Sequence, residues 1–269
     1  MRKRPLLITG LVISAALVLA SILAPAFAPN EPYRVDMRNA LQTSSADFPL
    51  GTDQLGRCVL SRLMFGARTS LGVAFMVTVV TFFIGTAVGT LSGLFAGKLP
   101  DKLLTAFCEV VLAFPGIILA LVISGTLGPG VFNMMLAIAL VSWAGFARVV
   151  RSLAISVKDA EYMKAAKASG TRGIKLVTRH VLPNIAGAIL TILVTSLGNT
   201  ILQIAGLSFL GLGAAPPAAE WGMMINDARI YISSTPSLIL YPVAAVSIAV
   251  LGFHLIGDGL KDMSDSREV

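Results

Sequence analysis

Hydrophobic residues along this chain gather into six long runs, which short polar segments separate. The runs lie at about 6–24, 69–97, 103–126, 131–149, 183–205 and 238–257. Each run is long enough, or nearly so, to cross a bilayer as a helix, which takes about 20 apolar residues. The pattern therefore predicts an all-α integral membrane protein with six transmembrane helices in one bundle.

A polar stretch sets the first run apart from the other five. We expect two parts: residues 1–68, with the first transmembrane helix and an outside-facing polar segment, and residues 69–269, a core of five transmembrane helices. Within the first part, residues 57–68 are predicted to form an interfacial helix. Within the core, a charged loop at 150–182 separates the fourth run from the fifth.

The composition agrees with a membrane protein, since 55% of the residues are hydrophobic and only 13% are charged. This balance excludes a soluble globular protein and makes membrane lipid an expected partner. The net charge of +7 does not indicate nucleic-acid binding, because the sequence has no basic patch with interleaved aromatic residues.

The positive charges are distributed unevenly between the two sides of the predicted bundle. Fifteen of the 21 Lys and Arg residues lie on the side that holds both termini, the 98–102 turn and the 148–180 region. Lys and Arg are retained on the cytoplasmic side of membrane proteins. We therefore expect a multi-pass protein with both termini in the cytoplasm.

The N-terminus imitates a secretory signal, because Arg2-Lys3-Arg4 precedes the first apolar run and Ala26-Phe27-Ala28 follows it. The run exceeds the usual apolar core of a signal peptide, and Pro29 beside the candidate site would hinder cleavage. We expect the segment to be retained as a transmembrane helix. Cleavage would leave five spans in the same orientation.

The most polar part of the core runs from Arg151 to Leu182, where seven Lys and Arg residues stand against two acidic ones. A short helix is expected in it, because Ser156 and Asp159 can form a capping box and Gly170 suits the position after a helix C-terminus. The small side chains in this helix would let the backbone of another protein approach closely.

This segment resembles the cytoplasmic loop of ABC importer permeases, which sets a coupling helix into an ATPase subunit. The resemblance rests on the Ala-Ala pair, the glycine that follows, and the Leu-Pro step at the next span. It implies that the ATPase-coupling residues are Glu161, Lys164, Ala165, Ala166, Gly170, Leu182 and Pro183. Lys164 stands where the family motif usually has Glu. The alternative is an ordinary basic inner loop.

The outside-facing segment resembles one group within this family more specifically. The strings Pro49-Leu50-Gly51-Thr52-Asp53 and Gly66-Ala67-Arg68-Thr69-Ser70-Leu71 are similar to the segment before the second span in the C-type permease of dipeptide, oligopeptide and nickel ABC importers. Cys58 stands where that pattern usually has Asp, and Phe48 stands where His is common.

The resemblance implies a type I ABC importer permease fold in the inner (cytoplasmic) membrane of a bacterium or archaeon. It also implies three kinds of protein partner: a second permease subunit in a heterodimer, two cytoplasmic ATPase subunits that bind ATP and Mg, and an extracytoplasmic solute-binding protein. This chain is then not an enzyme and needs no cofactor of its own. A secondary transporter, the alternative class, should show inverted repeats and paired intramembrane charges, and the sequence shows neither.

The string from Ala219 to Ile232 looks more like the nickel-importing members than the peptide-importing ones. A nickel ion or nickel chelate is therefore the predicted cargo, with a dipeptide or oligopeptide as the alternative. No metal site is predicted in this chain, because its cysteines and histidines, at positions 58, 108, 180 and 254, lie in four separate regions.

Two further features concern the spans. Gly85, Gly89, Gly93 and Gly97 recur every four residues, which predicts a close helix contact either within the subunit or with the partner permease. In the third run, Glu109 is expected to have a structural role near the inner end rather than to carry protons. Just beyond it, Pro115 is expected to kink the helix by removing a backbone donor.

A stretch rich in Gly and Pro follows the fifth run. Broken backbone at membrane depth is tolerated where it is buried in protein or lines water, and the resemblance places this stretch near the substrate entrance. The outer-gate and substrate-path candidates are Phe209, Gly211, Gly213, Glu220, Trp221, Asn226 and Asp227. Trp221 could alternatively be an interfacial anchor.

Overall fold

The computed structural model describes residues 4–265, and the chain in this range is helical apart from its connections. The α-helices are α1 (Arg4–Phe27), α2 (Val59–Leu94), α3 (Leu99–Leu112), α4 (Gly116–Leu127), α5 (Val131–Lys158), α6 (Glu161–Ala168), α7 (Gly173–Leu176), α8 (Leu182–Phe209), α9 (Trp221–Ala228) and α10 (Ser237–Asp265). Short 3₁₀ turns lie at η1 (Met37–Asn39) and η3 (Arg229–Tyr231), and a π-helical turn lies at η2 (Val177–Val181). The all-α prediction is confirmed.

Within the described range, five helices are long and apolar enough to cross a membrane, and the number is six if α3 and α4 form one bent span. The five are α1, α2, α5, the run from α7 through α8, and α10. Arg2, Lys3 and Arg267, which contribute to the predicted charge asymmetry, lie outside the described residues.

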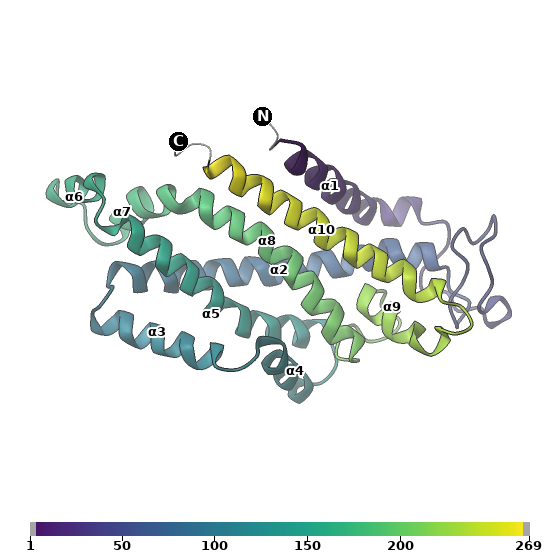
Figure 1. Ribbon diagram of the computed structural model, residues 1–269. Coiled ribbons are helices and arrows are strands. Elements are labelled where there is room, and N and C mark those ends of the chain that lie inside the picture. Colours follow the sequence, from purple (N-terminus) through teal and green to yellow (C-terminus); the bar gives the residue numbers. More distant parts are fainter. Residues whose placement is uncertain (1–3, 266–269) are drawn as a thin grey trace.

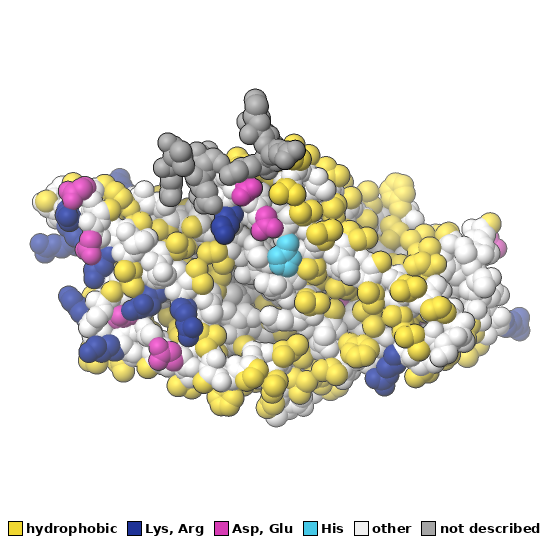
Figure 2. Space-filling model, in the orientation of Figure 1, with side chains coloured by type: hydrophobic (Ala, Val, Ile, Leu, Met, Phe, Trp, Pro, Cys, Tyr) yellow, Lys and Arg dark blue, Asp and Glu magenta, His cyan; other side chains and the backbone are white. Residues whose placement is uncertain are grey.

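The helices form an elongated bundle in which α2 and α5 pack together, and α10 packs against both α8 and α1 (Figure 1). At one end lie α6 and α7, and at the other lie α9 and the 28–58 segment. The chain ends of α1 and α10 point toward the α6 end. Lys and Arg side chains gather at that end, whereas hydrophobic side chains cover the middle of the bundle (Figure 2).

The second span is a single helix of 36 residues that begins at Val59. The prediction of a separate interfacial helix at 57–68 was therefore wrong, because most of those residues form the first turns of α2. A polar helical turn outside the membrane has the same sequence character whether it stops at the interface or continues into the bilayer.

Gly85, Gly89 and Gly93 bring α2 against α5 within this subunit. A Cβ atom added at Gly85 would lie 2.7 Å from Cδ1 of Phe146, and one added at Gly89 would meet the carbonyl oxygen of Ala147. These distances are far shorter than ordinary carbon contacts, so only glycine fits at this approach.

The prediction was wrong for Gly97, the fourth glycine of the series. It lies beyond the end of α2 at Leu94, has φ +84°, and has no atom within 4 Å of an added Cβ. Its left-handed backbone belongs to the turn into α3 rather than to a helix contact.

The third span is broken rather than kinked. The axes of α3 and α4 differ by 80°, and Pro115 stands at the break as the residue that precedes α4. Proline lacks the N–H that would continue the hydrogen bonding of α3, which ends at Leu112.

Candidate functional site

A groove of about 270 Å³ opens in the middle of the bundle between α2, α5 and α8. Seven of its lining side chains are polar but uncharged. They are Thr78, Thr81, Ser142, Ser196, Asn199, Thr200 and Gln203. The sequence does not reveal this site, because single Thr, Ser, Asn and Gln residues in apolar runs do not show which face of a helix they occupy.

Several polar groups in the groove have no partner among the described residues. The hydroxyl groups of Thr78 and Thr81 are buried without a hydrogen bond. The amide of Asn199 is exposed on α8 and makes no hydrogen bond to the described part of the chain. The two threonine hydroxyls are closed to the groove, whereas the exposed Asn199 amide can hydrogen-bond a polar solute, water or a second polypeptide.

A second hollow of about 560 Å³ continues the groove toward the α6 end. Ile192, Ser196 and Asn199 line both hollows, so α8 presents one continuous face to them. Asp258 and Lys261 on α10 line the second hollow. The polar face of α8 therefore leads from the middle of the bundle to the end where Lys and Arg gather.

The predicted coupling segment forms α6 at that end. Glu161 lies in its first turn and Lys167 in its last, an arrangement that matches the helix dipole. Lys164, which replaces the usual Glu, pairs with Glu161 at 2.8 Å between Nζ and Oε1. Both side chains are exposed, so this pair contributes at most about 1 kcal/mol.

The structure corrects the placement of Ala166. The sequence suggested that Ala165 and Ala166 together face a partner, but Ala166 is buried beneath α6, in a cluster with Met163 and Val150. Ala165 is exposed. A helix turns about 100° per residue, so neighbouring alanines cannot both lie on the outer face.

Gly170 ends α6 in a Schellman motif. Its φ is +85°, its N–H donates to the carbonyl of Lys167, and the N–H of Thr171 donates to the carbonyl of Ala166. The predicted capping box is absent, because Asp159 is the C-terminal cap of α5 and the Ser156 hydroxyl donates to the carbonyl of Leu153.

Leu182 and Pro183 lie where η2 passes into α8. The N–H of Leu182 donates to the carbonyl of Val177 and closes the π-helical turn. Pro183 has no N–H to offer the carbonyl of Arg179, so the wider turn lets the chain continue as a helix past the proline.

At the opposite end, Glu220 and Trp221 are buried rather than open to a substrate. Glu220 caps α9 by accepting hydrogen bonds from the N–H groups of Gly222 and Met223, and it also accepts one from the Ser70 hydroxyl of α2 at 2.9 Å. Trp221 is 1% exposed, and its Nε1 donates to the carbonyl of Leu63. Both residues fix α9 to α2, and Trp221 is not an interfacial anchor.

Gly211 and Gly213 lie in the turn between α8 and α9, while Phe209 is the last residue of α8 and Asn226 lies on α9. Gly211 has φ +85°, and the amide of Asn226 donates to the carbonyl of Phe209. An added Cβ at Gly213 would overlap the side chain of Ser208, so this glycine lets the turn fold back on α8.

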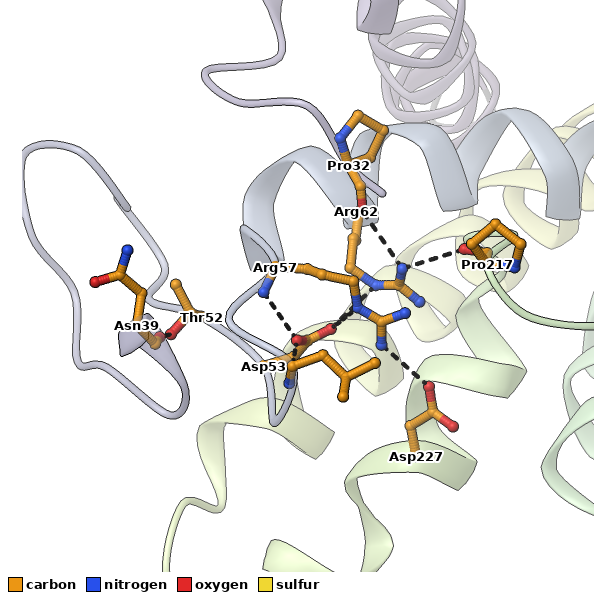
Figure 3. Close-up of polar contacts among 9 residues, drawn as sticks. Pro32, Asn39, Thr52, Asp53, Arg57, Arg62, Pro217 and Asp227 are labelled. Atoms are coloured by element: carbon orange, nitrogen blue, oxygen red, sulfur yellow. Dashed lines mark hydrogen bonds and ion pairs between the residues drawn. The ribbon is translucent and has the colours of Figure 1, made fainter. Parts of the chain in front are cut away.

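Asp227, the last of these candidates, is half-buried and belongs to a charge cluster with the buried residues Asp53, Arg57 and Arg62 (Figure 3). Arg57 Nε lies 2.6 Å and Arg62 Nε lies 3.4 Å from Oδ2 of Asp53. Arg57 Nη2 also lies 3.6 Å from Oδ2 of Asp227. Burial raises the pKa of Asp227, and the two guanidinium groups oppose that rise.

Arg62 extends the cluster, since its Nη1 donates to the carbonyls of Pro32 and Pro217 at 3.4 Å each. The cluster therefore joins the outer segment, α2 and the loop before α9. In the sequence, the Gly-Thr-Asp string shows only a family resemblance, and nothing there indicates that Asp53 pairs with Arg57 and Arg62.

No group of three or more His, Cys, Asp or Glu residues in the described chain has the geometry of a metal site. Glu109 is exposed on α3. Together, a multi-helix membrane bundle, a neutral polar groove and a helix projecting from one end are features typical of a membrane transport subunit.

Comparison with known proteins assigns the family. Residues 85–268 match the binding-protein-dependent transport system inner membrane component, and residues 1–44 match the N-terminal TM domain of oligopeptide transport permease C. The chain therefore belongs to the permease family of type I ABC importers, as a C-type subunit of the dipeptide, oligopeptide and nickel group.

Relatives with different transported solutes are similar to nearly the whole chain. The dipeptide transport system permease protein DppC of Alkalihalophilus pseudofirmus is 39% identical over 99% of this chain and 88% of its own length. The nickel transport system permease protein NikC of Escherichia coli K12 is 37% identical over 97% and 94%. A glutathione transport system permease protein, GsiD of Escherichia coli O6:K15:H31, is 36% identical over 99% and 88%.

Proposed function

We propose that this chain supplies half of the translocation path of an ATP-driven importer and that the groove between α2, α5 and α8 is its part of that path. The observation that carries the proposal is the continuous polar face of α8 from Gln203 to Thr191, which lines both hollows. The hydroxyl groups of Thr195, Ser196 and Thr200 on this face donate to backbone carbonyls of α8, and their oxygens can still accept a hydrogen bond. Together with the amides of Asn199 and Gln203, they can contact a passing solute without holding it by charge.

The partners are those of an ABC importer. A second permease closes the open side of the groove, two cytoplasmic ATPases bind ATP and Mg, and an extracytoplasmic solute-binding protein delivers the cargo to the end that holds α9. Both termini and α6 then lie in the cytoplasm. The gathering of Lys and Arg at the α6 end supports this orientation.

The proposed cargo is a nickel chelate, with a short peptide as the alternative. Both are small solutes with several carboxylate or amide groups, which neutral hydrogen-bonding side chains can accommodate. The groove contains no cluster of nitrogen, sulfur or carboxylate ligands for a bare nickel ion. The identities of 39% and 37% to a dipeptide and a nickel permease do not separate the two cargoes.

The test uses the complete importer with its binding protein in vesicles. We expect Asn199→Trp to block uptake while ATP hydrolysis and assembly persist. Leu190→Trp is the matched control, because Leu190 is an exposed residue of α8 that lines neither hollow. Normal uptake by the Asn199 variant would refute the path. Parallel uptake assays with a nickel chelate and a labelled dipeptide decide the cargo, and uptake of the dipeptide alone would reject nickel.

A further inference from the structure

A third hollow, of about 550 Å³, lies between α1, α2, α8 and α10 and is distinct from the polar groove. Most of its lining is apolar. The main apolar residues are Val18, Leu71, Phe75, Leu197, Ile201 and Phe253. The Ser21 hydroxyl, the one other polar side chain in this lining besides Arg68, donates to the carbonyl of Val18. The hollow therefore offers little to a polar solute.

Arg68 lines the same hollow on α2, one helical turn before Leu71. Its side chain is exposed, and within the described chain it makes no hydrogen bond or ion pair. Arg57 and Arg62, earlier on the same helix or just before it, are buried and paired with Asp53. Arg68 is thus a free guanidinium at one end of an apolar slot.

The depth of Arg68 in the membrane follows from the length of α2. At the α6 end, the hydroxyl of Ser92 donates to Asp101, which marks the polar boundary of the bundle there. Arg68 lies about 36 Å from Ser92 along the helix axis at 1.5 Å per residue. The hydrocarbon core is about 30 Å thick, so Arg68 reaches the headgroup region on the opposite membrane face.

The hollow also faces away from the path. Leu197 and Ile201 line the hollow, whereas Asn199 and Gln203 on the same helix line the polar groove. Residues two positions apart are about 160° apart around a helix, so the two sites lie on nearly opposite sides of α8.

We propose that this hollow is a phospholipid site, with an acyl chain between α1 and α2 and the headgroup phosphate on Arg68. A guanidinium can bind a phosphate through two parallel hydrogen bonds. The lipid acyl chain would fill the hollow and contact its apolar lining. The slot is open beside Gly72, where no atom lies within 4 Å of an added Cβ. The bound lipid adds to the direct packing of α1 against α2 and α10.

The test places a photoreactive phenylalanine analogue at position 75 in the complete importer, purified from membranes in mild detergent. After irradiation, we expect this chain to gain the mass of a phospholipid. Arg68→Gln should lower the adduct yield about tenfold or more, because glutamine keeps an N–H donor but loses the charge and the second parallel hydrogen bond. Arg229→Gln is the control, because Arg229 is also exposed and lies outside the hollow. Its yield should be unchanged.

Filling the slot provides a second variant. Gly72→Leu should exclude the acyl chain and abolish the adduct, and if this variant does not assemble, Arg68→Gln decides alone. An adduct to another protein chain would show that a partner helix fills the hollow. An adduct with detergent only, or a yield that does not depend on Arg68, would also overturn the proposal.

Discussion

Arg151 donates two parallel hydrogen bonds to Asp101, from Nε to Oδ1 at 2.6 Å and from Nη2 to Oδ2 at 2.8 Å. This pair joins the start of α3 to the last turns of α5. The hydroxyl of Ser92 on α2 and the N–H of Gly97 also donate to the carboxylate. Three helices therefore meet at one acidic side chain at the end of the bundle that carries α6.

Asp101→Asn should destabilise this junction by about 1.5–3 kcal/mol, because the amide retains only one acceptor oxygen for a guanidinium that donates twice. The measurement is the thermal unfolding midpoint of the purified complex. Glu109→Gln is the control on the same helix and should leave both the midpoint and ATP-driven uptake nearly unchanged. An equal loss in both variants would show that the Asp101 contacts contribute nothing specific.

The charge cluster at the other end predicts a larger effect. Arg62→Met removes a cation whose side chain is 2% exposed and leaves Asp53 with one guanidinium partner fewer. Breaking a buried ion pair on one side costs about 3–5 kcal/mol. We expect proteolysis of the 28–58 segment to become much faster in this variant. Arg38→Met, at an exposed position of η1, should leave the rate unchanged.

Hydrophobic patterning was sufficient to predict most of the fold. Runs of about 20 apolar residues identify helices that cross a bilayer. The five long candidate spans therefore overlap five of the six predicted runs, and the bent pair of α3 and α4 covers the sixth. Interruptions were harder to predict. Pro115 indicated a kink, but the size of the bend depends on how α4 packs against α5, which no local pattern records.

Among the predicted site residues too, features of the local backbone were easier to predict than contacts between distant parts of the chain. Gly170 was assigned its turn correctly, because a left-handed cap is a local property of the backbone. Glu220 and Asp227 were predicted as outer-gate and substrate-path candidates, and the structure pairs them with Ser70 and Arg57, which are distant in sequence. The sequence alone contains no signal for such pairings.

The α2–α5 contact yields a prediction about assembly. Gly89→Leu should force the two helices apart, because an added Cβ already meets the backbone of Ala147, and overpacking of this kind costs about 1–3 kcal/mol or more. The yield of folded subunit in membranes should fall. Gly187→Leu is the control, since no atom lies within 4 Å of its added Cβ. Normal yield of the Gly89 variant would contradict the observed approach.

The orientation can be measured directly. In a background with Cys58 and Cys108 replaced, a single cysteine at position 172, beside α6, should react with a membrane-impermeant reagent only from the cytoplasm. A cysteine at position 44 should react only from outside, since it lies in the segment at the opposite end of the bundle. Labelling of both positions from the same face would contradict the proposed orientation.

The last prediction concerns coupling of α6 to the ATPase. Its two neighbouring alanines differ in exposure, since Ala165 is exposed and Ala166 is buried. Ala165 is exposed on α6, so Ala165→Trp should obstruct a docking partner while the subunit stays folded. At about 1.4 kcal/mol per tenfold change, an overpacking cost of about 1–3 kcal/mol would weaken ATPase association by one to two orders of magnitude.

Ala166→Trp should act differently, because Ala166 is buried against the cluster that contains Met163 and Val150. It should lower the stability of α6 itself as well as transport. Gly170→Val should strain the cap at φ +85° without a clash, since no atom lies within 4 Å of its added Cβ. The measurements are ATPase binding, solute-stimulated ATP hydrolysis and protease protection of residues 158–172. Normal ATPase binding and uptake in the Ala165 and Gly170 variants would exclude α6 from coupling, whatever the Ala166 variant does.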